Sequence, residues 1–307
     1  MWMEGSTSGV YRMWFQHMDM NRIPFYQYNT IIVGTGAAGL NAAVTLHKLG
    51  QKNIALITEG RYMGTSRNTG SDKQTYYKMT QCGSEPDSVR KMAKTLFEGG
   101  CVDGDIAMAE AAGSLRAFYH LVDIGVPFPF NKSGEYVGYK TDHDPLKRGI
   151  SAGPLTSKYM TECLERQAEE RGIPFFDGYQ AVRLLTEEKD GEKRAAGIIA
   201  LNKQKAASPD ERYAVFSAVN IIWATGGEAG MYQASVYPVS QTGGMGVLLE
   251  AGAVAKNLTE SQFGIASVKY RWNLSGTFQQ CLPRYLSAEQ DGSHEREFLN
   301  DYFDTPR

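Results

Sequence analysis

The segment TIIVGTGAAGL at residues 30–40 decides the fold of this chain. Its first four residues are β-branched and predict a short buried strand that ends at a glycine-rich turn. After the turn, residues 37–49 repeat small or aliphatic side chains at helical spacing, and Gly50 ends the helix. Residues 53–58 predict a second buried strand, so residues 30–59 form one βαβ unit whose strands are parallel neighbours in a sheet.

The turn carries the spacing GxGxxG, with glycines at Gly34, Gly36 and Gly39. The first glycine permits a tight turn, the second lets the backbone approach a pyrophosphate, and the third allows close packing of helix on strand. Glu59 follows about 20 residues after Gly39, at the end of the second strand, where a carboxylate can accept hydrogen bonds from a ribose. Glycine-rich turns occur in many folds, but strand, helix and acid together predict a dinucleotide site. The carboxylate disfavours NADP, whose 2′-phosphate it would repel.

Further elements follow from the same reasoning. Residues 61–83 are rich in Gly, Ser, Thr and Asn and predict a long loop that contacts a ligand. Helices are predicted at 86–99, 106–125 and 154–171, and strands at 173–177, 181–187, 195–201 and 214–223, with a charged hairpin turn at 188–193. The fold class is therefore α/β: a Rossmann-type domain with a parallel sheet, a helical insertion and a small β-meander.

Composition excludes several classes of function. The chain has 307 residues and a formal net charge of −2, without a run of basic residues, so we expect no nucleic-acid partner. No segment approaches the roughly 20 apolar residues of a membrane span, and no signal peptide is evident, which predicts a cytoplasmic protein. The four cysteines form no CxxC pair, so we expect free and mostly buried thiols. The Asp142-His143-Asp144 triplet is more typical of a solvated turn than of a metal site, and we expect no metal.

The choice of cofactor comes from a resemblance. Five segments, in order along the chain, resemble the FAD-binding part of the fumarate reductase, succinate dehydrogenase and L-aspartate oxidase flavoprotein family. They are residues 31–40, 64–70 (GTSRNTG), 105–128, 224–227 (ATGG), and 250–253 (EAGA) followed by 260–263 (ESQF).

This resemblance implies a bound FAD and a role for each matching residue. The pyrophosphate would lie on the turn at Gly34, Gly36, Ala37, Ala38 and Gly39, and the adenosine ribose on Glu59. The flavin ring would lie along the loop at Gly64, Thr65, Ser66, Asn68, Thr69, Gly70 and Ser71. Ala224, Thr225 and Gly226 would pass the adenine end, and Gly244 would lie close to the flavin.

Three departures from the family's pattern carry predictions. Asn68 stands where respiratory members attach the flavin to a histidine, which predicts non-covalent FAD. Thr242-Gly243-Gly244 replaces a Gly-Asp-Gly turn and lacks its carboxylate. Gln262-Phe263 continues into Gly264 rather than His-Pro-Thr, so succinate, fumarate and aspartate are poor candidates for the substrate. Tyr270, Arg271, Arg284 and Tyr285 follow, and an arginine there could clamp a carboxylate or act as the proton donor, although an ordinary surface role is the first expectation for each residue.

The resemblance implies an FAD-dependent oxidoreductase that transfers a hydride between flavin N5 and a small, carboxylate-bearing substrate, with an electron-transfer protein as a candidate partner. The alternatives are a non-catalytic flavin-binding fragment without a complete substrate site, and an NAD-dependent dehydrogenase with the same βαβ start. We expect an N-terminal arm at 1–27, an FAD-binding domain at 28–263, and the beginning of a substrate-capping domain at 264–307. Family members continue for hundreds of residues past this point, so either the chain is an N-terminal fragment or truncated product, inactive if its site is incomplete, or the resemblance ends before residue 307. No catalytic acid or base is assigned.

Overall fold

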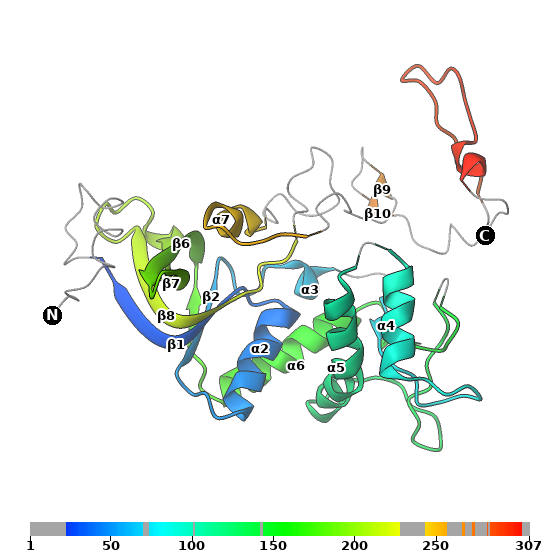
Figure 1. The fold of residues 1–307 in the computed structure, drawn as a ribbon, viewed down its shortest axis with the longest axis horizontal. Coiled ribbons are helices and arrows are strands. Elements are labelled where there is room, and N and C mark those ends of the chain that lie inside the picture. The colour runs from blue at the N-terminus through cyan, green and yellow to red at the C-terminus, as the bar shows by residue number, and fades with distance from the viewer. Residues whose placement is uncertain are drawn as a thin grey trace.

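The structure is a computed structural model that describes residues 23–69, 74–100, 102–141, 144–227, 243–256, 266–267, 272–273, 281 and 283–302. A six-stranded sheet organises the molecule, in the order β5-β2-β1-β8-β7-β6 (Figure 1). Its strands are β1 (Phe25–Val33), β2 (Ile54–Thr58), β5 (Phe175–Asp177), β6 (Tyr179–Lys189), β7 (Glu192–Asn202) and β8 (Tyr213–Trp223). The strands from β5 to β8 in this order are parallel, whereas β7 pairs antiparallel with both β8 and β6.

The predicted βαβ unit is confirmed. Helix α2 (Ala37–Lys48) connects β1 to β2, and the two strands pair in register from Thr30 with Ile54 to Val33 with Ile57. β1 begins at Phe25, five residues earlier than predicted, because residues 25–28 pair with the start of β8. The predicted domain division at residue 28 thus falls within this strand, and the division itself stays a prediction.

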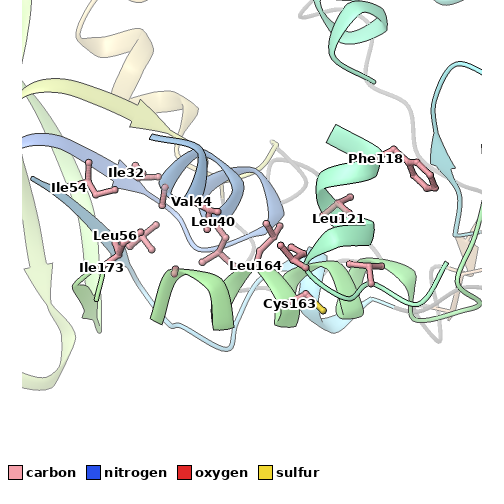
Figure 2. Packing of buried hydrophobic residues seen from close by; sticks show 14 of the residues in the cluster. Ile32, Leu40, Val44, Ile54, Leu56, Phe118, Leu121, Cys163, Leu164 and Ile173 are labelled. Carbon is pink, nitrogen blue, oxygen red and sulfur yellow. The ribbon is translucent and has the colours of Figure 1, made fainter. Parts of the chain in front are cut away.

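Helices cover one face of the parallel strands. They are α2 and α6 (Thr156–Glu170), next to which α5 (Gly104–Asp123) packs, while α4 (Val89–Glu98) packs against α5. Ile32 and Leu56 of the sheet, Leu40 and Val44 of α2, and Leu164 of α6 form a continuous apolar cluster (Figure 2). The cluster extends to Phe118 and Leu121 of α5, so the predicted helical insertion shares one core with the sheet. These side chains are almost fully buried, and burying each contributes about 1.5–3 kcal/mol to folding.

The opposite face of the sheet is covered by its own antiparallel part. Ile31, Val33 and Ile57 alternate with the residues of the first cluster and pack against Ile198 and Phe216 of β7 and β8. β6 contacts β2 although the two lie far apart in the strand order, so the sheet curls over itself. Two register shifts between β6 and β7 accompany this curl, as β-bulges increase twist. The predicted β-meander is therefore continuous with the main sheet.

The hairpin between β6 and β7 is tighter than predicted. The strands continue through the charged residues to Lys189 and Glu192, and the turn is Asp190-Gly191 alone. Both turn residues have positive φ, 56° and 80°, which is the backbone of a type I′ turn.

The prediction of a loop without secondary structure at residues 61–83 is wrong in two places. Helix α3 (Thr65–Asn68) and strand β3 (Tyr76–Tyr77) lie within it, and β3 pairs with β4 (Gly149–Ile150). The remaining elements are η2 (Lys203–Lys205), α7 (Met245–Glu250), β9 (Ala266–Ser267), β10 (Trp272–Asn273) and η4 (Phe298–Asp301). Among the described residues, no helix is both long and apolar enough to cross a membrane.

The structure describes three of the four cysteines, and Cys82 and Cys163 are free thiols. Cys163 is buried in the main core, Cys82 is half-buried, and Cys281 is exposed, so the prediction of mostly buried thiols holds only for Cys163. Cys281 differs because it lies in the short segments after α7, away from the helices and sheet that make the core.

Candidate functional site

Three parallel strands end side by side at the carboxyl edge of the sheet, and hydrogen bonds hold these ends together. The amide of Gly34 donates to the carbonyl of Ile57 at 2.8 Å, and the amide of Ala224 donates to the carbonyl of Val33 at 2.8 Å. The hydroxyl of Thr35 donates to that of Thr58 at 3.0 Å in a buried contact. In open α/β sheets, ligands bind at this edge.

The glycine turn is too tight for side chains. Gly34 has φ = 108°, and a β-carbon there would lie 2.3 Å from the carbonyl oxygen of Ala224. A β-carbon on Gly39 would lie 2.1 Å from the carbonyl oxygen of Gly34, so the first turn of α2 lies directly on the strand end. The roles predicted from the spacing for the first and third glycines thus agree with these contacts.

The start of α2 faces the same edge. Gly36 is its N-cap residue, and no described side chain caps the helix. The amides of Ala37, Ala38 and Gly39 belong to the first turn, where a helix has no acceptors of its own. Together with the partial positive charge of the helix terminus, such amides bind phosphate groups. Residues 37–39 could therefore hold a pyrophosphate.

The segment around α3, residues 61–69, reaches the glycine turn, and we call it the α3 loop. A β-carbon on Gly36 would lie 3.3 Å from the Oγ of Ser66, so the two segments touch. Gly64 precedes α3 with φ = 98°, and the Thr69 hydroxyl donates to the carbonyl of Thr65 at 2.6 Å. The Asn68 amide donates to the carbonyls of Tyr62 and Gly64 at 2.8 and 3.1 Å. Gly70 and Ser71 lie outside the described residues.

Two arginines anchor this loop to α6. Arg61 Nε donates to Glu165 Oε1 at 2.5 Å, and a second nitrogen of Arg61 pairs with Glu169. Arg67 pairs with the other oxygen of Glu165 and lies 3.8 Å from Glu162. The Glu165 side chain is only 10% exposed, so this network is sheltered from solvent. No local sequence pattern indicates this network, because the partners lie about 100 positions apart.

The end of β8 and the start of α7 contact each other beside the glycine turn. A β-carbon on Gly244 would lie 2.7 Å from both Thr225 Oγ1 and Trp223 Nε1. Both atoms are buried and have no hydrogen-bond partner among the described residues. Buried donors without partners are costly, at about 1–3 kcal/mol each. Thr225 and Gly244 were predicted to lie at the cofactor, whereas Trp223 was missed. An aromatic residue directly before the ATGG segment was the available signal.

Glu59 and Lys203 form an ion pair at this edge. Lys203 Nζ lies 2.8 Å from Glu59 Oε1, and the Glu59 side chain is 30% exposed. Only one carboxylate oxygen takes part in this contact, so the second oxygen has room to accept from a hydroxyl.

Other candidates lie away from this edge. Arg284 pairs with Glu297 of the C-terminal segment, and Tyr285 is half-buried beside it. Asp144 pairs with Arg148 in the helical insertion. Asp142, His143, Gln262, Phe263, Tyr270 and Arg271 lie outside the described residues. Within the part of the chain that the structure describes, no three His, Cys, Asp or Glu side chains gather into a metal-binding group.

The donor set at the edge fits a dinucleotide. It offers a helix N-terminus for the phosphates, a carboxylate for the ribose, and two buried donors beside Gly244. The glycines at 34, 36 and 39 leave no β-carbon between the backbone and such a ligand.

Comparison with known proteins agrees with this geometry. A profile described as FAD binding domain matches residues 29–283. L-aspartate oxidase from Agrobacterium fabrum is 28% identical over 76% of this chain and 42% of its own length, and the succinate dehydrogenase flavoprotein subunit of Coxiella burnetii is 24% identical over 80% and 41%. The chain therefore spans less than half the length of these relatives.

Solved structures share the fold. Mycobacterium smegmatis Sdh1 has a TM-score of 0.64 at 18% identity and covers 75% of this chain and 39% of its own. E. coli quinol fumarate reductase has a TM-score of 0.62 at 20% identity, with 74% and 37% covered. The chain thus belongs to the FAD-binding domain family of oxidoreductases, alongside the flavoproteins of L-aspartate oxidase and succinate dehydrogenase, and FAD is its cofactor.

Proposed function

We propose that the chain holds FAD non-covalently across the carboxyl edge of the sheet and serves as the flavin-binding part of an oxidoreductase. The observation that carries this proposal is the convergence of four distant segments: Gly34 contacts Ala224, Gly36 contacts Ser66, and Gly244 contacts Thr225. Three of these segments, at residues 31–40, 64–70 and 224–227, are among those whose order along the chain resembles the flavoprotein family.

Each segment has a task in binding. The first turn of α2 binds the pyrophosphate through backbone amides, and Glu59 accepts from the ribose while Lys203 holds its other oxygen. The α3 loop lies along the flavin ring, and the arginine pairs to α6 keep this loop in place. Preorganised backbone donors need no rearrangement when the ligand arrives.

The reaction we propose is hydride transfer between flavin N5 and a small, carboxylate-bearing substrate, chemistry that the bound FAD supplies. The protein's part is to position the ring and to hydrogen-bond to it. Asn68 supports non-covalent attachment because an amide cannot form the bond that a histidine makes, and its side chain already donates to two carbonyls of its own loop.

The substrate and the electron-transfer partner are proposals about the longer protein. The relatives named above extend well beyond the part that this chain matches. A non-catalytic flavin-binding module is the second candidate function. The ion pair of Arg284 with Glu297 favours it, because this pairing occupies one of the arginines considered for a substrate carboxylate.

The test begins with the visible spectrum of the purified chain and the cofactor released by acid. We expect a yellow protein whose FAD remains in the supernatant after precipitation. Yellow colour in the pellet would refute non-covalent attachment, and a colourless protein that takes up no FAD would refute the binding proposal. Reduction of the bound flavin by an artificial electron donor, followed by its reoxidation with a panel of small carboxylic acids, then separates an oxidoreductase from a binding module.

A further inference from the structure

Basic side chains gather at the opposite, amino-terminal edge of the sheet, where α2, α5 and α6 all end. We call this group the basic edge. It consists of His47 and Lys48 at the end of α2, Lys52 before β2, His120 in the last turn of α5, and Arg171 at the end of α6. Helix α2 separates the basic edge from the glycine turn by 12 residues, which is about 18 Å.

The basic side chains are held against one another rather than against acids. Lys48 Nζ lies 3.1 Å from His120 Nδ1. Lys52 Nζ lies 3.1 and 3.2 Å from the two ring nitrogens of His47, and 2.9 Å from the His47 carbonyl oxygen. Arg171 donates to the backbone and side-chain oxygens of Gln167.

No described carboxylate forms an ion pair with any of these five side chains. Asp123 is the acidic neighbour, at the end of α5, and Glu170 is taken up by Arg166 and Gln167. By contrast, Arg61, Arg67 and Arg148 all have carboxylate partners. The negative ends of three helices stabilise cations here, but only by about 0.3–1 kcal/mol each.

The pKa values of both histidines are lowered in this arrangement. Burial lowers the pKa of His120, and the charges of Lys48 and Arg171 lower it further, with Asp123 opposing them. Partial desolvation, Lys52 and Arg171 lower the pKa of His47. The second ring nitrogen of His120 is buried without a partner among the described residues. A bound anion would offset the repulsion from the neighbouring cations and favour protonation of both rings, so that each ring could donate through both of its nitrogens.

We propose that the basic edge is a binding site for a multiply charged anion of the phosphate class. Lys48, Lys52 and Arg171 supply fixed charge, and the two histidine rings add donors once an anion is present. The site is separate from the cofactor edge and does not depend on the proposed oxidoreductase function.

The probe is inorganic pyrophosphate, titrated calorimetrically into FAD-saturated protein at a constant ionic strength of about 0.15 M set with KCl, where diffuse surface attraction is screened. We expect saturable binding to one site. The double variant Lys48→Gln/Lys52→Gln should weaken this binding at least tenfold. The matched control Lys94→Gln/Lys158→Gln removes the same charge from exposed positions of α4 and α6 and should bind as the wild type does.

Pyrophosphate is also part of FAD, so the experiment must distinguish the basic edge from the cofactor edge. Binding that persists unchanged in the Lys48→Gln/Lys52→Gln variant would place the anion elsewhere and overturn the proposal. Absence of saturable binding would overturn it as well.

Histidine proton resonances give a second readout. Pyrophosphate should raise the pKa of two of the five histidines, and the Lys48→Gln/Lys52→Gln variant should lose this response. A rise shared equally by all five would indicate a nonspecific effect and contradict the assignment.

Discussion

Single atoms decide the fit at the glycine turn. The Gly39→Ala substitution adds a β-carbon 2.1 Å from the Gly34 carbonyl oxygen, a backbone atom that cannot turn away as a side chain could. The helix must move off the strand end, so we expect a loss of about 1–3 kcal/mol in the free energy of unfolding. The control is Gly113→Ala in α5, where nothing lies within 4 Å and alanine should stabilise by about 0.5–1 kcal/mol. Thermal melts of the two variants should shift in opposite directions, and equal shifts would contradict the close packing.

Glu59 is the residue on which the ribose contact depends. Removing its carboxylate with Glu59→Ala should weaken FAD binding roughly tenfold or more, since hydrogen bonds to charged groups contribute about 1.5–3 kcal/mol. Lys203→Ala is the matched control, because it breaks the same ion pair and leaves the carboxylate. Fluorescence titration with FAD measures both. If Lys203→Ala costs as much as Glu59→Ala, the ion pair matters rather than the ribose contact.

At the scale of the elements, the helical insertion, which carries α4 and α5 between β2 and α6, depends on a buried ion pair. Arg148 Nε and Nη2 donate to the two oxygens of Asp87 at 2.9 and 2.8 Å, and both side chains are 1% exposed. Burial by itself raises the pKa of Asp87, but the hydrogen bonds from Arg148 and from the amides of Thr80 and Ser88 outweigh it and lower the pKa below its usual value.

The sign of the resulting pH dependence follows from this lowered pKa. The ionised Asp87 contributes stability above about pH 4, and this contribution is lost as the pH falls through the pKa of the folded state. Asp87→Asn should lower the free energy of unfolding by about 3 kcal/mol near neutral pH. In urea unfolding, the gap to the wild type should stay constant down to about pH 4 and close below it, as the pH falls through the pKa of the folded state. Asp291→Asn, an exposed control, should leave the midpoint unchanged; a gap that is independent of pH would contradict the ionic role.

Sequence predicts those elements whose pattern is local. The βαβ unit was found because β-branched residues, glycines and helical spacing all occur within 30–59, and the long amphipathic helices were found in the same way. Helix α3 was missed because four residues are too few to show a period. The curl of β6 over β2 and the pairing of Arg67 with Glu165 depend on contacts between distant positions, which one sequence does not display. At the site, spacing identified the glycines and Glu59, whereas Lys203 and Trp223 required the structure.

At the scale of the whole molecule, the proposed FAD site draws on segments from both halves of the described chain. A ligand that binds only the folded state stabilises it by about 2.7 kcal/mol at a concentration of 100 Kd. For a chain of this size we expect FAD to raise Tm by roughly 5 °C. Riboflavin is the control because it lacks the pyrophosphate that α2 is proposed to hold. An equal shift with riboflavin would mean that the glycine turn does not bind phosphate.

The indole of Trp223, buried beside Gly244 and Thr225, gives the cofactor edge an optical reporter of its own. Flavin absorbs in the range where tryptophan emits. FAD bound at the cofactor edge would therefore quench the fluorescence of a nearby indole by energy transfer. Ultraviolet-excited emission should therefore fall as FAD binds, and Trp223→Phe should remove most of that change. Loading of the protein could then be watched in real time, without a label and without turnover.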